Sequence, residues 1–351
     1  KKGDSEKALF ILNEKLNNVP RNLLLNQLHS DIKSKRKNFL QNSFNCKNIS
    51  NVIAELFYIT ANALSTQSLH SFSNFYINLA KYLNQNFFSY NSLLAENFVM
   101  VKDYQKAEKI YLFLKEFGEN YSWHSSKQIA LLKIENSQSK KALTILEKSY
   151  KNLRSPNHYQ TYDFAEFLKN NEEFEKSIKY YSNILDNISK DHELYPKTKD
   201  GRGIAYERIG DWPKAEKDFL DSLAAKPNQA YVINYLAYSW IEKGIKIEKS
   251  LKMLEEANRL RSNDGYITDS LGWALYKLKR YDKAKEYLKK AVQLMPSDPI
   301  VNDHFADVLW MIGDKLQARY YWKYVLNLEE TKDDLKKTIM RKILDGPTVL
   351  N

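Results

Sequence analysis

A small residue recurs along most of the chain at a nearly constant interval, and no other sequence feature restricts the fold so strongly. Successive members of this series are 35, 35, 38, 35, 34 and 34 residues apart. A second small-residue series runs in step, about twelve residues earlier. Helices that cross closely need small side chains at the crossing, so the two series predict a repeated helical hairpin. The members are Ala107, Ala142, Ser177, Ala215, Ser250, Ala284 and Ala318, and Ala95, Ala130, Ala165, Gly203, Ala237, Gly272 and Ala306.

Composition agrees with a helical repeat array. The 351 residues include only 10 Gly and 8 Pro, fewer than the turns of a sandwich, a barrel or a doubly wound sheet require. The 46 aromatic residues disfavour a disordered chain. A chain of this length exceeds one ordinary hydrophobic core, whereas a repeat array has no need of a central core. The composition therefore favours an extended all-α protein.

The segment 265–298 is one copy of the repeat, and it resembles the tetratricopeptide pattern. Its small residues fall where two helices touch, its bulky ones fill the space between them, and Pro296 ends the second helix. The resemblance implies a right-handed superhelical α-solenoid of hairpins. The matching residues are Leu271, Gly272, Tyr281, Ala284, Leu288, Ala291 and Pro296.

The register divides the chain into four parts. Residues 1–87 are read as degenerate N-terminal helical repeats, in which Ala8 and Leu12 belong to the second helix of a truncated hairpin that ends at Pro20. Residues 88–195 are central repeats, and the single 38-residue interval predicts a longer connection around 191–196. Residues 196–330 are the well-formed C-terminal repeats. Residues 331–351 form a capping amphipathic helix and a tail.

The first helix of each tetratricopeptide hairpin lines the concave side of the solenoid, which suggests where a partner binds. In the C-terminal repeats the groove-facing positions are aromatic and acidic, a surface suited to an extended peptide or a partner helix. The alternative that some of these aromatics only pack between neighbouring helices stays open, above all for Tyr266 and Tyr276. The predicted groove residues are Tyr231, Asn234, Tyr238, Tyr266, Asp269, Trp273, Tyr276, Asp303, Asp307 and Trp310.

The sequence shows few of the motifs that mark a catalytic, cofactor-binding or metal-binding site. It lacks a nucleophile elbow, a phosphate-binding glycine loop and a zinc-protease motif, so we expect no catalytic residues and no cofactor. Asp303, His304 and Asp307 could be read as a carboxylate–histidine metal site with Asp269. Because Asp303 and His304 are adjacent on one helix, they do not easily face the same ion, and hydrogen bonds between repeats are the favoured interpretation.

The net charge of +11 raises the alternative of an RNA-binding helical repeat. The positive charge is spread over the chain, with +6 in residues 1–175 and +5 in residues 176–351. A groove rich in Asp and Trp is poorly matched to phosphates, so we expect no specific nucleic-acid partner. A second alternative is that the chain is the regulatory arm of a larger enzyme.

Four short motifs resemble those of a narrower proteobacterial tetratricopeptide family. They read NYLAY at 234–238, DGYITDSLGW at 264–273, NDHFAD at 302–307 followed by Trp310, and KILDG at 342–346. The family has NYLGY, DGYIxDSLGW, NDHLGDxYW and KLxxG, so Ala237 and Ala306 replace glycines with another small residue.

Members of that family are exported, often as outer-membrane lipoproteins facing the periplasm, and one group resembles adaptors that bring substrates to a C-terminal processing protease. The resemblance implies a periplasmic scaffold, with any lipid-bearing cysteine upstream of Lys1. A cytoplasmic location is the alternative. The leading hypothesis from the sequence is a non-catalytic solenoid that binds a protein or peptide partner.

Overall fold

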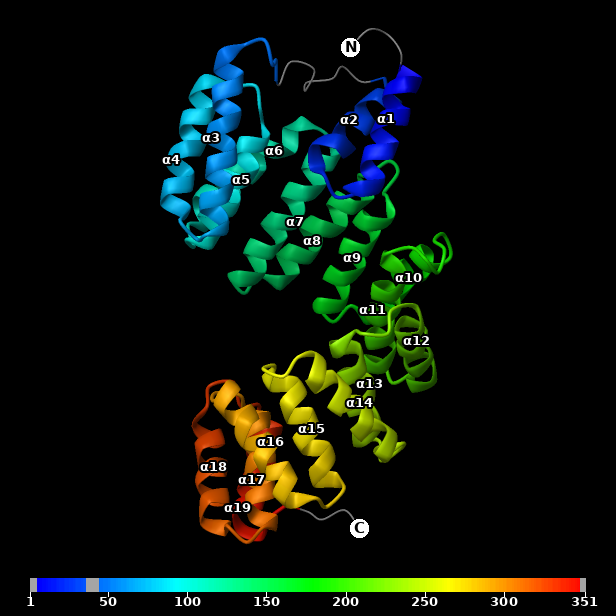
Figure 1. Cartoon of the computed structure of the whole chain (residues 1–351), viewed down its shortest axis with the longest axis vertical. Helices are drawn as coiled ribbons and strands as arrows, with labels where there is room; N and C mark the ends of the chain where they lie inside the picture. Colours follow the sequence, from blue (N-terminus) through cyan, green and yellow to red (C-terminus); the bar gives the residue numbers. More distant parts are fainter. Residues whose placement is uncertain (1–4, 36–43, 348–351) are drawn as a thin grey trace. The chain divides into compact units, whose positions relative to one another are not determined.

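The computed structural model describes residues 5–35 and 44–347, which form nineteen α-helices, one short 3-10 helix and no strand (Figure 1). The chain divides into two compact units, Lys1–Tyr180 and Tyr181–Asn351. The helices of the first unit are α1 (Ser5–Asn18), α2 (Leu23–Lys33), α3 (Ile49–Thr66), α4 (His70–Leu83), α5 (Ser89–Met100), α6 (Tyr104–Leu114), the 3-10 helix η1 (Lys115–Phe117), α7 (Glu119–Glu135), α8 (Ser139–Lys151) and α9 (His158–Asn170).

The second unit begins within α10 (Phe174–Leu185) and is a row of helical hairpins. Within each hairpin the two helices pack along each other, and the second helix also packs on the first helix of the next hairpin. The pairs are α11 (Leu194–Arg208) with α12 (Trp212–Ala225), α13 (Ala230–Glu242) with α14 (Ile247–Leu260), α15 (Gly265–Lys277) with α16 (Tyr281–Leu294), and α17 (Pro299–Met311) with α18 (Lys315–Asn327), followed by α19 (Asp333–Asp345).

Both small-residue series are buried at all fourteen positions, which confirms the predicted hairpin repeat. Two glycines show how close the helices come. A Cβ on Gly203 would lie 2.8 Å from the Phe219 ring, and one on Gly272 would lie 2.6 Å from Cγ of Leu288. The residues between the two helices of a hairpin therefore have to be small because a larger side chain would push the helices apart.

The turn between the helices of each hairpin repeats with the same period. From α3 onward, each of these turns contains a residue with a positive φ, which reverses the chain in few residues, and the turn between α13 and α14 contains a second one, Lys246. Glycine occupies this position in three turns, and lysine, serine or glutamate occupies it in the others. These residues are Ser68, Lys102, Ser137, Glu172, Gly210, Gly244, Lys279 and Gly313.

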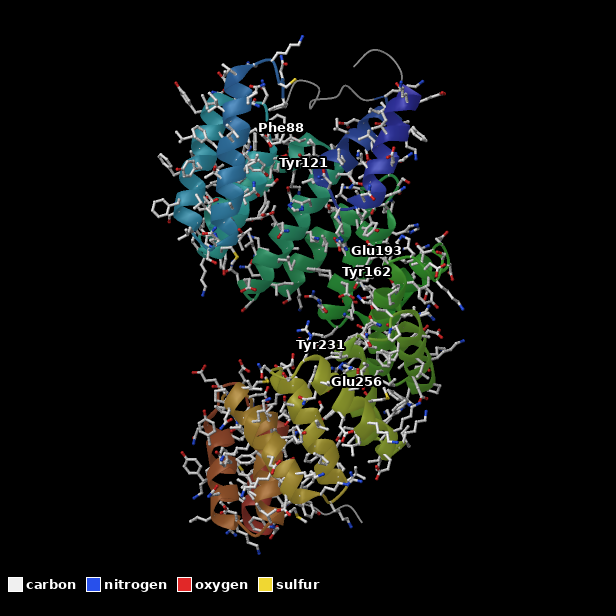
Figure 2. The ribbon with its side chains drawn as sticks, in the orientation of Figure 1. Phe88, Tyr121, Tyr162, Glu193, Tyr231 and Glu256 are labelled. Carbon is white, nitrogen blue, oxygen red and sulfur yellow. The ribbon has the colours of Figure 1, made fainter. Side chains whose placement is uncertain are left out.

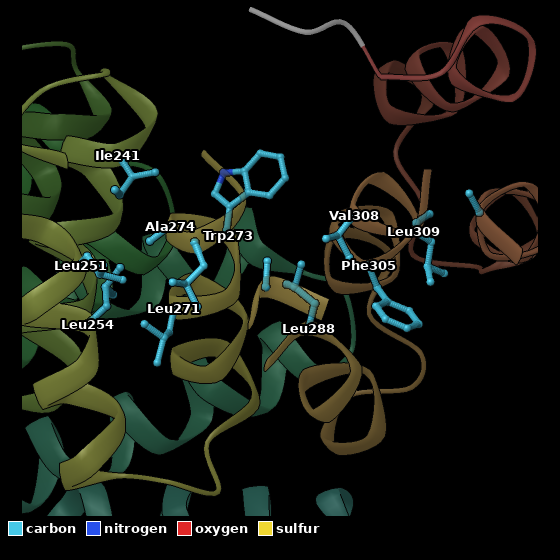
Figure 3. Close-up of a cluster of buried hydrophobic side chains, with 14 of the residues drawn as sticks. Ile241, Leu251, Leu254, Leu271, Trp273, Ala274, Leu288, Phe305, Val308 and Leu309 are labelled. Carbon is cyan, nitrogen blue, oxygen red and sulfur yellow. The ribbon is translucent and has the colours of Figure 1, made fainter. Parts of the chain in front are cut away.

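The largest hydrophobic cluster lies in the second unit and joins successive hairpins. Ile241, Leu251 and Leu254 come from one hairpin and pack on Leu271 of the next, and the cluster continues through Phe305 to α19 (Figure 3). The repeats are thus stabilised by contacts between neighbours. The side chains that the groove prediction concerns project from α13, α15 and α17, which this core holds in place.

The structure differs from the sequence-based expectations at one connection. Helices α1 and α2 pack on each other and form the N-terminal hairpin of the described residues. The sequence assigned α1 to the second helix of a truncated repeat, and that register stays a prediction. The long connection covers residues 186–193, slightly earlier than expected. Pro196 lies in the first turn of α11, where its missing N–H breaks no helical hydrogen bond.

Candidate partner-binding site in the C-terminal repeats

Three large side chains are exposed at equivalent positions in successive hairpins. Tyr231, Tyr266 and Ile300 stand in the first turns of α13, α15 and α17, and their exposed fractions are 53%, 60% and 45%. Figure 2 labels Tyr231 at the start of α13. We call Tyr231, Tyr266 and Ile300 the first-turn ladder. It presents apolar or aromatic surface at the second residue of the first helix in each of the three repeats.

Asp264, the N-cap residue of α15, holds the side chain of Tyr231 in place. The Tyr231 hydroxyl donates a hydrogen bond to Oδ2 of Asp264 at 2.8 Å, while Oδ1 of Asp264 accepts from the N–H of Ile267 and caps α15. The guanidinium of Arg261 lies 4.8 Å from the Tyr231 ring centroid. One exposed aromatic is therefore preorganised by its neighbours, which lowers the entropy cost of using it in binding.

A layer of stacked rings lies two turns further along α15 than Tyr266. The indole of Trp273 stacks on the His304 ring at 3.9 Å and on the Tyr276 ring at 4.7 Å between centroids. Trp273 Nε1 donates to Glu242 at 2.6 Å, and His304 Nδ1 lies 2.9 Å from Oδ2 of Asp269. The contact between α15 and α17 is the inter-repeat hydrogen bond that the sequence favoured over a metal site, and the structure confirms it for His304.

The next layer towards the C-terminus is a buried ion cluster. Lys342 of α19 donates to both oxygens of Asp303 at 2.8 Å and to Oδ2 of Asp307 at 2.9 Å. Trp322 Nε1 also donates to Asp303, at 2.9 Å. All of these side chains are buried. One ammonium thus lies between two carboxylates, so the chain itself provides the cation that balances them.

The chain after α19 covers Trp310. Gly346 has a φ of +82°, and a Cβ there would lie 2.3 Å from Nε1 of Trp310. On the same indole, Lys315 and Arg319 place their charged groups 5.0 Å and 4.9 Å from the ring centroid. Arg319 also donates to the carbonyl of Ile343 at 2.9 Å. The indole of Trp310 is therefore largely engaged by groups of the same chain.

The buried layer shifts the pKa values of its titratable groups. Burial raises the pKa of Asp307 to about 7, with the nearby Asp303 carboxylate acting in the same direction and Lys342 opposing it. Burial by itself would lower the pKa of His304, but Asp269, Asp303 and Asp307 outweigh it and raise that pKa. Both groups therefore hold a proton more strongly in the folded chain than in the unfolded one.

The predicted groove residues thus fall into two sets. Tyr231 and Tyr266 are exposed, and Asn234, Tyr238, Tyr276 and Trp310 are half-buried. Asp269, Trp273, Asp303 and Asp307 are buried and already paired or stacked within the chain. The structure brings the second set together as a buried layer, which Tyr276 joins by stacking on Trp273, and of the first set it leaves Tyr231 and Tyr266 exposed. Direct contact of either set with a partner stays a prediction.

The tetratricopeptide repeat family matches residues 61–331, well over half of the chain. The chain belongs to the tetratricopeptide repeat family. A curated relative, the TPR repeat-containing protein PA4667 of Pseudomonas aeruginosa, is 30% identical over 136 residues. That match covers 39% of this chain and 22% of the relative, so this tetratricopeptide chain aligns with less than a quarter of the relative's length.

Solved tetratricopeptide structures are similar to this chain at low sequence identity. A tetratricopeptide repeat protein from Parabacteroides merdae is 15% identical with a TM-score of 0.50, over 63% of this chain and 85% of that one. The thermophilic protein TTC0263 from Thermus thermophilus is 16% identical with a TM-score of 0.45, over 54% of this chain and all of that one. Tetratricopeptide proteins are generally non-catalytic scaffolds that bind proteins or peptides.

Two residues that shape this tetratricopeptide site escaped the sequence-based prediction of the site. Lys342 and Trp322 each bond a predicted groove residue, yet neither was predicted as part of the site. Lys342 stands in the KILDG motif, and the only available signal was its position on the otherwise apolar side of a short amphipathic helix. A lysine there requires a buried acid as partner.

In the described part of the chain, no three His, Cys, Asp or Glu side chains are grouped so that they could hold a metal ion. Over the same residues, the helices are all too short or too polar to cross a membrane.

Proposed function

We propose that this protein is a non-catalytic adaptor of the bacterial periplasm whose C-terminal repeats bind a protein or peptide partner. The first-turn ladder is the observation that supports it. Three exposed apolar or aromatic side chains recur on consecutive first helices, at the period of the repeat. An extended peptide or a partner helix running along the repeats would meet one such anchor in each hairpin.

The buried layer supports this assignment by fixing the ladder. The stack around Trp273 and the ion cluster around Lys342 join α15, α17 and α19 through directional contacts. The helices that carry Tyr266 and Ile300 are therefore held in register before any partner arrives. A preorganised surface loses less conformational entropy on binding than a mobile one.

The finer parts of the proposal rest on the four motifs at 234–346. They support the proposed role of presenting substrates to a C-terminal processing protease and the proposed anchoring to the outer membrane through a segment upstream of Lys1. The name of the relative PA4667 describes a repeat-containing protein, so the relative adds support for the fold and none for the partner.

The test is co-purification with the C-terminal processing protease of the same organism. Replacing Tyr231 and Tyr266 by alanine is expected to weaken the complex by about 2 kcal/mol or more, roughly thirtyfold, measured by calorimetry. The matched control is Leu316→Ala with Tyr320→Ala on α18, two exposed side chains away from the ladder. Equal losses in both double variants, or a ladder variant that binds like the unmodified chain, would contradict the proposal.

A further inference from the structure

The N-terminal hairpin breaks the stacking order of the repeats. From α3 onward in the first unit, α4 packs on α5 and α6 packs on α7. The same rule would place α2 on α3. Among the described residues, α2 instead packs on α7, five α-helices further along the chain (Figure 1). The hairpin of α1 and α2 thus packs beside the repeat that contains α7.

Helix α2 contacts the start of α7 through the side chain of Gln27. The side chain of Gln27 accepts a hydrogen bond from the backbone N–H of Asn120 at 2.9 Å and so caps a helix that has no capping side chain of its own. Gly118 makes room for it, since a Cβ there would lie 2.2 Å from Nε2 of Gln27. Its φ of +121° is also one that only glycine readily adopts.

Further polar contacts extend this docking to α9. The Asn120 side chain donates to Oγ of Ser30 at 2.9 Å. Arg21, at the turn before α2, forms an ion pair with Asp163 at 2.7 Å and lies 5.3 Å from the ring of Tyr159. The contacts that hold α2 therefore come from the first turn of α7 and the first two turns of α9. Their main elements are the Arg21 guanidinium and, six residues later, the Gln27 amide.

Leucines complete the recognition face of α2. Leu23, Leu24 and Leu28 pack against the cluster that contains Phe88 and Tyr121, which Figure 2 shows at the starts of α5 and α7. The three leucines are only half-buried. A helix with this pattern of leucines, an amide and an arginine is amphipathic in the usual sense of a partner helix in a groove.

Several features show that the hairpin is loosely held. Helix α1 has no buried residue, and the buried residues of α2 are the polar pair Gln27 and Asp31. A pocket of about 180 Å³ that is open to solvent lies between the hairpin and the helices α7 and α9. His124 lines this pocket, and its buried Nε2 has no hydrogen-bond partner within the described residues. The contact of α2 with α7 and α9 therefore leaves part of their surface open to water.

The place that the stacking rule assigns to the hairpin is uncovered. One face of α3 exposes apolar side chains at helical spacing, namely Ile49, Val52, Ile53, Leu56 and Ile59. On α1, Phe10 and Ile11 are exposed as well. If the hairpin left α7, its exposed apolar side chains could pack on the apolar face of α3, the next helix in the sequence. Such packing would lower the free energy needed to release the hairpin.

From these contacts we propose that the first turn of α7 and the first two turns of α9 form a docking site for an amphipathic partner helix, which α2 fills from within the chain and from which the partner displaces it. The partner carries the chemistry of α2, an arginine for Asp163 and Tyr159, a side-chain amide for the Asn120 N–H, and leucines for the cluster beside Tyr121. The site lies in the first unit and is independent of the ladder in the second.

The test compares three forms of the full chain in a Cys46→Ser background. The locked form carries Ser30→Cys and Asn120→Cys, oxidised to a disulfide that is verified by mass. The released form carries Arg21→Ala and Gln27→Ala, and neither substitution changes a residue of α7 or α9. The third form is the locked chain after reduction. The probe is a labelled peptide of residues 19–35 that carries His29→Glu, with the introduced carboxyl condensed with the Lys33 amine to a lactam, and it is shown to be helical by circular dichroism.

We expect the probe to bind the released form at least about tenfold more tightly than the oxidised locked form, because the resident helix competes at a high effective concentration. Reduction of the locked form should restore binding. A probe with the Arg21→Ala and Gln27→Ala changes should bind at least about tenfold more weakly. Equal affinity for the locked and released forms overturns the proposal, as does the absence of binding to a released form with an unchanged circular dichroism spectrum.

Discussion

The first and second units each carry a terminal element that packs on their repeats, but different chemistry holds it. Helix α19 is fixed by fully buried Ile339 and by the ion cluster of Lys342 with Asp303 and Asp307. The hairpin of α1 and α2 is fixed by amides and an exposed ion pair, and it leaves a solvent-open pocket beside it. The contrast separates a permanent cap from an exchangeable one.

The physical difference lies in what each element leaves behind when it departs. Removing Lys342 would strand two carboxylates in a buried site, which is costly because no water replaces the ammonium. Removing Gln27 exposes the first N–H groups of α7 to water, which satisfies them at little cost. The same kind of polar contact therefore has opposite consequences at the two ends.

The largest effect is expected from Lys342→Met. The variant leaves Asp303 and Asp307 without a cation, so the free energy of unfolding of the second unit should fall by about 3–5 kcal/mol. Urea unfolding followed by tryptophan fluorescence measures it. Lys336→Met on the same helix is the matched control, since Lys336 lies 4.0 Å from an exposed carboxylate and should change stability by less than about 0.5 kcal/mol. Similar losses in both variants would refute the permanent cap.

The ion cluster should also make stability depend on pH, to a smaller extent. Burial raises the pKa of Asp307 to about 7, so the folded chain binds its proton more strongly than the unfolded chain between about pH 4 and pH 7. Stability should therefore fall as the pH rises through this range, and the raised pKa of His304 acts in the same sense above pH 6.5.

Asp307→Asn removes this ionisation while Asp303 still balances Lys342. The melting temperature at pH 8 should rise by a few degrees, and the decrease between pH 5.5 and pH 8 should become smaller. Asp345→Asn, which alters an exposed carboxylate of α19, should leave the pH profile unchanged. A steeper profile in the Asp307 variant would mean that the carboxylate stabilises the fold as a charged group.

The smallest effect is expected from Gln27→Ala in the first unit. Loss of one capping hydrogen bond should weaken the docking of α2 by about 1 kcal/mol and leave the rest of the unit as stable as before. Hydrogen exchange should show faster exchange in α2 and unchanged rates in α8. The control is Asn13→Ala on the exposed side of α1. Destabilisation of the whole unit by Gln27→Ala would make the hairpin a permanent part of the fold and erase the contrast.

The repeat could be predicted from the sequence because it depends on local packing. A small residue such as Gly272 is needed wherever two helices of a hairpin cross, and the chain meets this need every 34 or 35 residues over most of its length. The docking of α2 on α7 was not predictable in the same way. It joins Gln27 to Asn120 across 93 residues, and neither residue belongs to a repeated pattern.

The groove could be predicted only in part. The periodicity placed Tyr231, Tyr266, Asp269 and Asp303 on the first helices of hairpins, and the structure confirms that placement. Whether such a side chain faces solvent depends on its neighbours in the next repeat. His304 reaches back to Asp269, and Lys342 covers Asp303, so both carboxylates are buried while the tyrosines remain exposed.

The sequence by itself determined that this protein is an array of tetratricopeptide hairpins, because small residues at a fixed period specify how neighbouring helices cross. Only the tertiary structure decided which groups are free to meet a partner. Burial and pairing arise from contacts between distant segments, as when Lys342 neutralises Asp307 or Gln27 caps α7. Such contacts leave no periodic trace in the sequence because each of them occurs once.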